Sequence, residues 1–406
     1  MTSPQSGLRL GFVSMHTSPI ASPGSADAGG MNVVALNSAL ALGRRGHQVD
    51  LITRRDDPAE PDVVELADNV RLLNLDAGPA RHIAKSRQEA LIQPFAEALG
   101  RLAPYDLLHC HHWFSGVAAL EWAHASSMPV VQSFHSVAAP DQAPLSAGEP
   151  PESPGRRAGE QRVARDADLV VAVSQAEAHT VRERYGTAED RLAVVYPGVD
   201  LAQFRPLEPG ERHWAWDGIG GCYLLFAGRL QPLKAPDLAI RTLAALPTRD
   251  RPHLVLAGEA SQDFAGYEAQ LHALVDELGL RDQVTFLGSL TRPELASMLR
   301  GACLLLNPSY SETFGLICLE AEASGVPPVA ARHSGLLESV CDGAAGVLVD
   351  SRDPQDWARV VRELMDDGEV RARMGAAGRR FASQHSWDHV AQELEDVYAR
   401  VLEADR

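Results

Sequence analysis

The sequence predicts an α/β protein built from two doubly wound domains, each with a parallel sheet covered by helices on both faces. Three observations predict this class: the length of the chain, the alternation of short strand patterns with longer helical patterns, and strand patterns that are apolar throughout. At 406 residues, 45% of them hydrophobic, the chain exceeds one ordinary core, so two domains are expected. Strands that are apolar on both sides are typical of parallel sheets buried between helices.

Twelve apolar runs are expected to form the strands. The first half has seven, at residues 8–14, 48–53, 70–75, 105–110, 129–134, 168–174 and 192–196. The second half has five, at residues 222–228, 253–258, 283–288, 302–308 and 327–332. The helical patterns between them complete the strand–helix alternation of doubly wound sheets.

The two halves meet in a stretch rich in proline, glycine and charge, with a hinge at Pro197–Pro206. We expect a first domain over residues 1–198, a second over 199–385, and a C-terminal helix within 386–406 that packs back toward the first domain. A proline-rich stretch at residues 136–157 predicts a long functional loop. Two hinged domains imply a cleft, and such sheets bind ligands beyond the carboxyl ends of their strands.

Charge and composition limit the classes of molecule that the protein is expected to bind. A formal net charge of −17 argues against nucleic acid and anionic membranes, which attract basic surfaces. No apolar run approaches the ~20 residues that cross a bilayer, and the N-terminus lacks the apolar region of a signal peptide. Five scattered cysteines indicate reduced core residues. We therefore expect a cytoplasmic protein that binds neither nucleic acid nor membrane.

Candidate functional residues follow the strands. After residues 8–14 come His16, Thr17 and a Gly29-Gly30 pair that opens a helix containing Asn32. Glycines at a helix N-terminus let an anion approach the unpaired backbone N–H groups. A plain turn with an N-cap remains the alternative.

The second domain offers cations and carboxylates at equivalent places. Arg229 and Lys234 follow residues 222–228 and suit a diphosphate, although a solvated loop is the alternative. Glu312 and Glu320 follow residues 302–308, and in a mostly helical segment they would lie two turns apart on nearly one face. Carboxylates suit the hydroxyls of sugars and ribose. Glu322 is expected to be an ordinary surface residue.

The stretch His109-Cys110-His111-His112 suggests a metal site at first sight. Neighbouring strand residues point to opposite faces, so these four converge poorly on one ion, and we expect neither a metal nor another cofactor. His135, which follows residues 129–134, is the better candidate for the cleft.

Together these elements resemble glycosyltransferase family 4, whose members have the retaining GT-B fold of two Rossmann-like domains facing a cleft. The strongest carriers are "FAGRLQPLKAPDLAI" and "NPSYSETFGLICLEAEASGVPPVAA", which contains a Glu-x7-Glu signature. The resemblance implies that the second domain binds a nucleotide sugar. Arg229 and Lys234 would hold the diphosphate together with Gly30, and His135 would lie near the reacting carbon. Glu312 would bind the donor sugar and Glu320 the ribose, and Thr313, Phe314 and Gly315 would also contact the donor.

Within that family, "HTSPIASPGSADAGGMN" and "HCHHWFSG" resemble the inositol-phosphate glycosyltransferases of mycothiol biosynthesis. Their acceptor site corresponds to Asn32, Lys85, His112, Ser136 and Arg156 or Arg157, beside His16 and Thr17. The subfamily has Tyr at position 112 and Thr at 136, two lysines that "HSVAAPDQ" lacks, and an Arg where this chain has Leu290.

These departures fall on the acceptor and the base, whereas the residues for the diphosphate and the donor sugar are retained. The resemblance therefore implies a retaining transfer from a GDP- or UDP-sugar to a small polar acceptor in antibiotic or other natural-product biosynthesis. Relatives in lincosamide pathways glycosylate the sulfur of ergothioneine. The alternatives are N-acetylglucosaminyl transfer to D-inositol 3-phosphate, a nucleotide-sugar epimerase and a non-catalytic binding subunit. A homodimer is possible.

Overall fold

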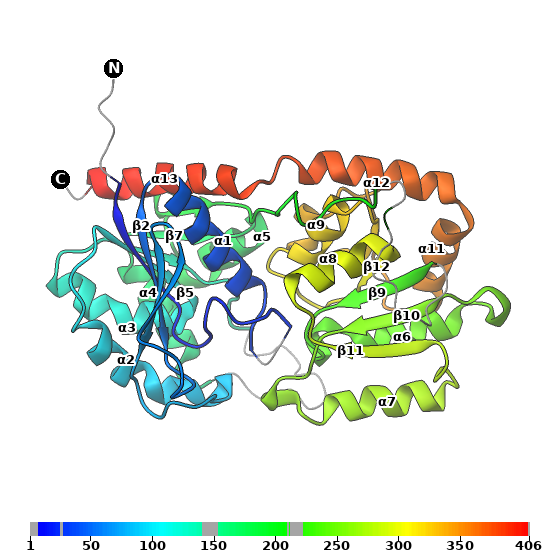
Figure 1. The fold of residues 1–406 in the computed structure, drawn as a ribbon, viewed down its shortest axis with the longest axis horizontal. Coiled ribbons are helices and arrows are strands. Elements are labelled where there is room, and N and C mark those ends of the chain that lie inside the picture. The colour runs from blue at the N-terminus through cyan, green and yellow to red at the C-terminus, as the bar shows by residue number, and fades with distance from the viewer. Residues whose placement is uncertain (1–6, 25–26, 140–152, 209–210, 212–221, 405–406) are drawn as a thin grey trace, which may run out of the picture.

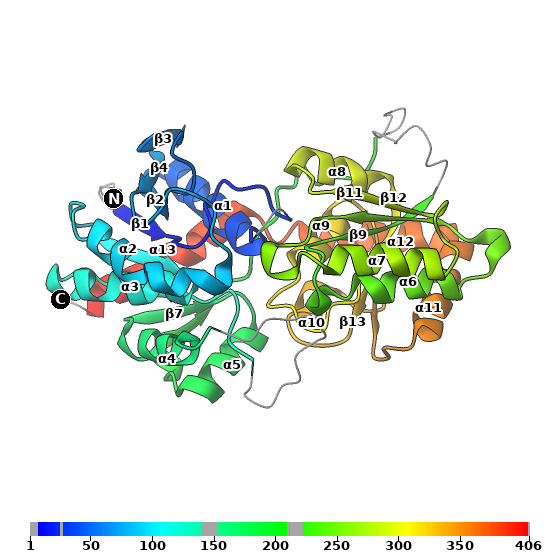
Figure 2. The same ribbon diagram turned by 90° about the horizontal axis from the view of Figure 1, so that it is seen from below.

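The computed structural model describes residues 7–24, 27–139, 153–208, 211 and 222–404. Two lobes lie side by side, each with a sheet between helices (Figure 1), and the view from below shows the same two lobes (Figure 2). The first sheet has the order β3-β4-β2-β1-β5-β6-β7-β8 and the second β11-β10-β9-β12-β13-β14. All neighbouring strands are parallel except β3 and β4. The predicted fold class is confirmed.

The strands match the twelve predicted runs and add two. Their bounds are β1 Arg9–Val13, β2 Gln48–Arg54, β3 Val63–Ala67, β4 Val70–Leu75, β5 Leu107–His111, β6 Val130–Ser133, β7 Leu169–Ala172, β8 Leu192–Val194, β9 Tyr223–Ala227, β10 His253–Ala257, β11 Val284–Gly288, β12 Ala302–Asn307, β13 Pro328–Ala331 and β14 Val347–Val349. The additions are β3, an antiparallel edge strand of alternating exposure, and the three-residue β14. Both lack the long apolar run used to recognise the others.

The α-helices are α1 Gly30–Arg44, α2 Ile92–Leu99, α3 His112–Ala125, α4 Arg156–Asp166, α5 Gln175–Tyr185, α6 Pro236–Ala245, α7 Tyr267–Glu277, α8 Arg292–Gly301, α9 Leu316–Ala323, α10 Leu336–Ser339, α11 Pro354–Asp366, α12 Gly368–Ala382 and α13 Trp387–Ala404. Short 3₁₀ turns include η1 Lys85–Leu91 and η3 Pro232–Lys234. No helix in the described ranges is long and apolar enough to cross a membrane.

The first sheet is covered on both faces. Helices α1 and α13 share a core with one face, which includes Leu10 and Phe12, while α3 packs on the other through Trp113 and Phe114. Helix α13 thus returns over the first domain after α12 has followed the second (Figure 1). The domain limits at 198 and 385 stay predictions.

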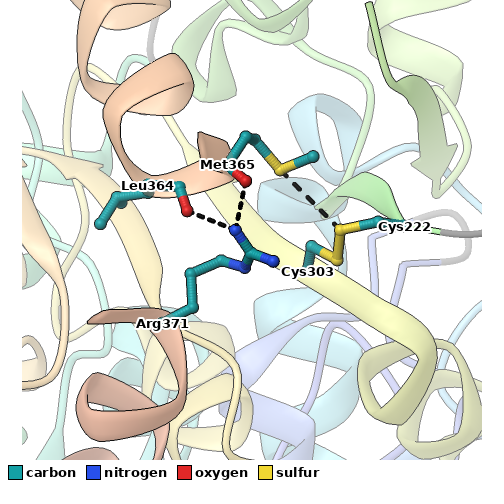
Figure 3. The surroundings of a disulfide bond; sticks show 5 residues. All are labelled: Cys222, Cys303, Leu364, Met365 and Arg371. Carbon is teal, nitrogen blue, oxygen red and sulfur yellow. Dashed lines mark hydrogen bonds between the residues drawn. A yellow bond between two sulfur atoms is a disulfide. The ribbon is translucent and has the colours of Figure 1, made fainter. Parts of the chain in front are cut away.

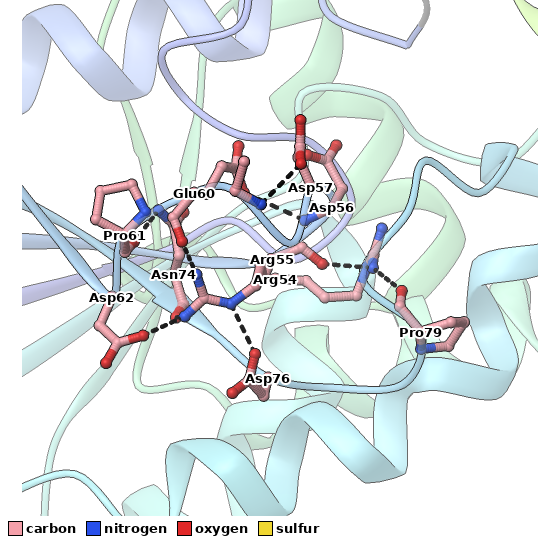
Figure 4. A network of polar contacts seen from close by, with 11 residues as sticks. Arg54, Arg55, Asp56, Asp57, Glu60, Pro61, Asp62, Asn74, Asp76 and Pro79 are labelled. Atoms are coloured by element: carbon pink, nitrogen blue, oxygen red, sulfur yellow. Dashed lines mark hydrogen bonds and ion pairs between the residues drawn. The ribbon is translucent and has the colours of Figure 1, made fainter.

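A buried arginine fastens the edge of the first sheet. Arg55, at the end of β2, donates to Asp76 (Nε–Oδ1 2.7 Å) and pairs with Asp62, which precedes β3 (Figure 4). It also donates to the carbonyls of Glu60 and Asn74. One side chain therefore ties three segments together beside the edge strand β3.

The expectation that all five cysteines are reduced is wrong. Cys222, before β9, and Cys303, in β12, form a disulfide with their Cα atoms 5.4 Å apart (Figure 3). Strands β9 and β12 are neighbours in the second sheet, which brings the two residues together. Cys110, Cys318 and Cys341 are free.

Candidate active site

A cavity of about 160 Å³ lies between the domains, at the carboxyl ends of the central strands. The first domain contributes Gly29 and Gly30 to its lining. The second contributes Arg229, Lys234, Glu312 and Glu320, among others. The structure therefore brings together the glycine pair and the four donor-side residues predicted from separate segments.

Helix α1 directs its N-terminus at this cavity. Gly29 is the N-cap, its amide donates to Asn32 Oδ1 (2.9 Å), and the first turn carries no acidic side chain. A Cβ placed on Gly29 would lie 3.9 Å from Arg229 Nε, so the helix start and the arginine face each other. Asp27, which precedes the glycine pair, accepts from the amide of Lys85 (3.2 Å). A positive dipole end beside a guanidinium forms an anion site.

Arg229 and Lys234 come from the loop that joins β9 to α6. Burial lowers the pKa of the Arg229 guanidinium, and the charges of Asp27 and Glu312 act against that shift. Within the described part of the chain, Arg229 makes no hydrogen bond or ion pair. Lys234 lies 2.7 Å (Nζ–Oε1) from Glu312. Pro236 is the first residue of α6, a position that suits proline.

The segment after β12 is a loop before it becomes a helix, which corrects the assumption of a mostly helical stretch. Glu312 lies in the loop, where its Oε1 accepts from Ser309 Oγ (3.1 Å), whereas Glu320 lies in α9. Gly315 has φ +96°, and a Cβ there would meet Leu336 at 2.6 Å. Only glycine fits this position comfortably.

Thr313 and Phe314, the two residues after Glu312, place their side chains in different surroundings. Phe314 was predicted to bind the donor, but its side chain lies in the core of the second domain, so only its backbone can contribute. Thr313 bridges the domains: its Oγ1 donates to the carbonyl of His135 (2.6 Å), and its own carbonyl accepts from Ser174 Oγ (2.6 Å).

Glu320 is buried and is paired with a residue that sequence reasoning missed. Arg292, the first residue of α8, places Nη2 2.6 Å from Glu320 Oε1 and stacks on Phe204 at 4.6 Å. Both Arg292 and Leu290 line the cavity. The signal that could have identified Arg292 was an arginine at the start of a helix just after β11. Glu322, expected on the surface, is instead fully buried between α9 and α12.

Two histidines of the first domain form a buried pair. The rings of His16 and His112 lie 4.3 Å apart, and His16 Nδ1 and both ring nitrogens of His112 have no partner among the described residues. Burial holds the pKa of both rings well below the usual value, and Lys85, Arg156 and, for His16, Arg229 lower it further. The pair is therefore neutral, and positive charges lie close to it.

The other residues predicted for the acceptor differ in the partners that they contact. Arg156 reaches Ser136 through Nη2 (Oγ 3.1 Å) and pairs with Glu160 (2.8 Å), while Lys85 begins η1. Asn32 and Thr17 are bonded to each other (3.0 Å), so they hold the loop before α1. Arg157 donates to the carbonyl of Ala139 (2.6 Å). Most of the 136–157 loop lies outside the described residues.

His135 follows β6 in a left-handed conformation, with φ +59°. Its Nε2 lies 2.8 Å from Nδ1 of His111, and burial lowers its pKa to about 3. His109 and His111 stack on one face of β5, whereas Cys110 enters the core on the other face. The described residues contain no group of three or more His, Cys, Asp or Glu arranged to hold a metal ion.

Comparison with known families gives two matches that together span most of the chain. Residues 28–203 match the family described as Glycosyltransferase Family 4, and residues 220–381 match Glycosyl transferases group 1. The chain is 39% identical to the D-inositol 3-phosphate glycosyltransferase of Mycolicibacterium smegmatis over 97% of this chain and 91% of that one. The corresponding protein of Kineococcus radiotolerans is also 39% identical, over 97% and 96%.

Solved structures give the same picture of the fold. Sucrose-phosphate synthase from Thermosynechococcus elongatus superposes with a TM-score of 0.86 at 26% identity, covering 98% of this chain and all of that one. Anabaena HepE, solved with UDP-glucose, superposes with a TM-score of 0.74 at 20% identity over 97% of this chain and all of HepE.

Proposed function

Because the chain belongs to the family 4, group 1 glycosyltransferases, we propose that it transfers a sugar from a GDP- or UDP-sugar to a small polar acceptor, with retention at the anomeric carbon. The observation that carries the proposal is the cavity between the domains. It places the N-terminus of α1 opposite Arg229, with Lys234, Glu312 and Glu320 on the same wall.

The leaving diphosphate would lie between the two domains. The N–H groups at Gly30, the Arg229 fork and the Lys234 ammonium would stabilise its growing negative charge, a contribution that is often the largest in such reactions. Glu312 would accept hydrogen bonds from sugar hydroxyls, and Glu320 from the ribose. The acceptor would attack from the side of the leaving group, beside His135.

The donor side of the proposal agrees with what fold neighbours bind. HepE was solved with UDP and with UDP-glucose. The contact of Thr313 with His135 and that of Ser86 Oγ with Asp263 Oδ1 (2.6 Å) join the domains around the cavity. Closure of this kind would keep water away from the donor.

For the acceptor, the neutral pair His16–His112 is the informative feature. Its unpartnered ring nitrogens suit a polar group that exchanges hydrogen bonds, and Lys85 and Arg156 suit an acidic group on the same molecule. We favour a small natural-product acceptor, including a thiol such as ergothioneine. The second candidate is D-inositol 3-phosphate, which the names of the 39% identical relatives favour.

A binding screen followed by product analysis tests the proposal. UDP, GDP, ADP and TDP are titrated calorimetrically, and sugars on the preferred nucleotide are then offered with ergothioneine, other small thiols, aminocyclitols and D-inositol 3-phosphate. A conjugate detected by mass spectrometry supports a transferase. Efficient use of D-inositol 3-phosphate with UDP-N-acetylglucosamine would establish the second candidate. An epimerised donor without any conjugate would refute transfer.

A further inference from the structure

A line of buried rings connects the C-terminal helix to His135. Tyr398, on α13, places its hydroxyl 2.7 Å from Nδ1 of His109, although 289 positions separate them in the sequence. His109 stacks on His111 with ring centroids 4.5 Å apart, and His111 stacks on His135 at 5.1 Å. His111 Nδ1 is also 2.8 Å from His135 Nε2. At the end of the line, the backbone carbonyl of His135 accepts the interdomain hydrogen bond from Thr313 Oγ1 (2.6 Å).

All three imidazoles of this line are neutral, so each ring carries a single proton. Burial lowers the pKa of His109 and of His135 to about 3, and it holds the pKa of His111 well below the usual value. Burial also raises the pKa of Tyr398, so its hydroxyl keeps its proton. The position of each proton can then be argued from the hydrogen-bond partners.

Around His109, one placement of the protons gives every hydrogen-bonding group a partner. Ser133 Oγ donates to the carbonyl of Val171 (3.0 Å), so it can only accept from His109 Nε2 (2.9 Å). His109 therefore carries its proton on Nε2, and its Nδ1 accepts from Tyr398. In the opposite tautomer the Tyr398 O–H would be buried without an acceptor, which proteins rarely allow.

The same reasoning gives the tautomers of His111 and His135. His111 Nε2 is buried and has no partner among the described residues. A proton there would be an orphaned donor, so the proton belongs on Nδ1 and is donated to His135 Nε2. His135 must then carry its own proton on Nδ1, the ring nitrogen that His111 does not engage. His135 is in this way set up as a hydrogen-bond donor.

We propose that Tyr398 is a positioning residue: it fixes the His109 ring, and the His111 ring stacked on it is thereby held where Nδ1 donates to His135 Nε2. That donation keeps the proton of His135 on Nδ1. The inference rests on the proposed function only in giving His135 a place beside the reacting carbon. The ring geometry and its test stand without it. The C-terminal helix would then contribute to the active site without touching substrate.

The test compares Tyr398→Phe with Tyr105→Phe. The control also removes a buried hydroxyl: Tyr105, just before the amino end of β5, donates to Asp50 Oδ2 (2.9 Å), whereas the line of rings begins further along β5 and continues beyond its carboxyl end. In protein labelled with ¹⁵N-histidine, long-range ¹H–¹⁵N spectra give the tautomer of each ring. We expect wild type and Tyr105→Phe to show His135 protonated at Nδ1, and Tyr398→Phe to show a shifted His109 and a mixed tautomer at His135.

Activity supplies the second readout. For the nucleotide sugar that the wild type uses, kcat of Tyr398→Phe should fall about tenfold, as expected for a misplaced catalytic group, while the donor KM changes little. Unchanged His135 signals in Tyr398→Phe, or wild-type His135 protonated at Nε2, would overturn the inference. If Tyr398→Phe does not fold, Ser133→Ala removes the other anchor of His109 and must perturb His135 in the same way. Absence of turnover in the wild type would refute the proposed function while leaving the spectra interpretable.

Discussion

Lys234 Nζ lies 2.7 Å from Glu312 Oε1 at the wall of the interdomain cavity, and both side chains are largely shielded from water. The cation proposed for the diphosphate and the carboxylate proposed for the sugar are thus partners before any donor binds. An incoming nucleotide sugar would contact both residues. Its phosphate would bind the Lys234 ammonium, and its sugar hydroxyls would donate to Glu312 in place of part of the ion pair.

Amine labelling tests whether a nucleoside diphosphate binds at Lys234. Lys85 and Lys234 are the two lysines in the sequence, and the first lies on the acceptor side. Saturating UDP or GDP should slow reductive methylation of Lys234 several-fold, because the ammonium becomes engaged by phosphate, while Lys85 reacts as before. Peptide mass spectrometry measures both sites in one sample. Equal protection of the two lysines, or none, would place the nucleotide elsewhere.

Gly30→Ala should separate stability from binding. A Cβ at Gly30 meets no atom within 4 Å, and alanine is favoured over glycine in helices, so Tm should not fall. The added methyl group would nevertheless stand where the diphosphate must approach the backbone N–H groups. We expect nucleoside diphosphate affinity, measured by calorimetry, to drop about tenfold, as for loss of one or two charge-assisted hydrogen bonds. Gly100→Ala, at the end of α2, is the control and should bind normally.

Thr313→Val tests the bridge between the domains. The variant keeps the shape of the side chain but loses the hydrogen bond to the carbonyl of His135. Because His135 then lacks one of its fixed points, kcat/KM should fall about tenfold or more. Thr285→Val, which removes a similar contact with His253 (2.7 Å) far from the cavity, should retain activity. Equal activity of both variants would argue against a role for the bridge.

Glu322 predicts a pH dependence of stability. Burial raises the pKa of this carboxyl from 4.5 to about 8, so the folded protein holds the proton more tightly than the unfolded chain. Its contribution is complete below pH 4.5 and is lost as pH rises toward 8. Glu322→Gln cannot ionise and should gain at least about 2 °C in Tm over wild type at pH 8, with little gain at pH 5.

Exposed Glu277→Gln is the control for that titration. A Tm difference between Glu322→Gln and wild type that stays constant from pH 5 to pH 8 would show that the carboxyl ionises normally in the folded protein. Glutamine suits the site because Glu322 Oε2 has no partner there among the described residues, so the amide replaces a group that was already unpaired.

The sequence was informative where structure depends on local pattern. Apolar runs located the strands of both sheets, and the rule that ligands lie beyond strand ends selected Gly30, Arg229 and Glu312, which line one cavity. The strand β3 was not predicted because it is a short edge strand of alternating exposure, and only Val64 and Leu66 of its side chains pack on the core.

Pairings between distant segments could not be read in this way. The contacts of Lys234 with Glu312, Arg292 with Glu320 and Tyr398 with His109 depend on how whole helices pack. Glu322 was misassigned for the same reason: its face of α9 is covered by α12, more than forty residues later in the chain. Local patterns therefore selected residues that line one cavity, and packing determined the partners of those residues.

The most direct test of the account is the kcat/KM of Lys234→Ala for formation of the glycosylated product from the preferred nucleotide sugar. The account predicts a loss of about 10²-fold or more, because a cation that stabilises the leaving diphosphate acts mainly in the transition state. An undiminished kcat/KM would contradict the assignment of the cavity as the site from which the sugar is transferred.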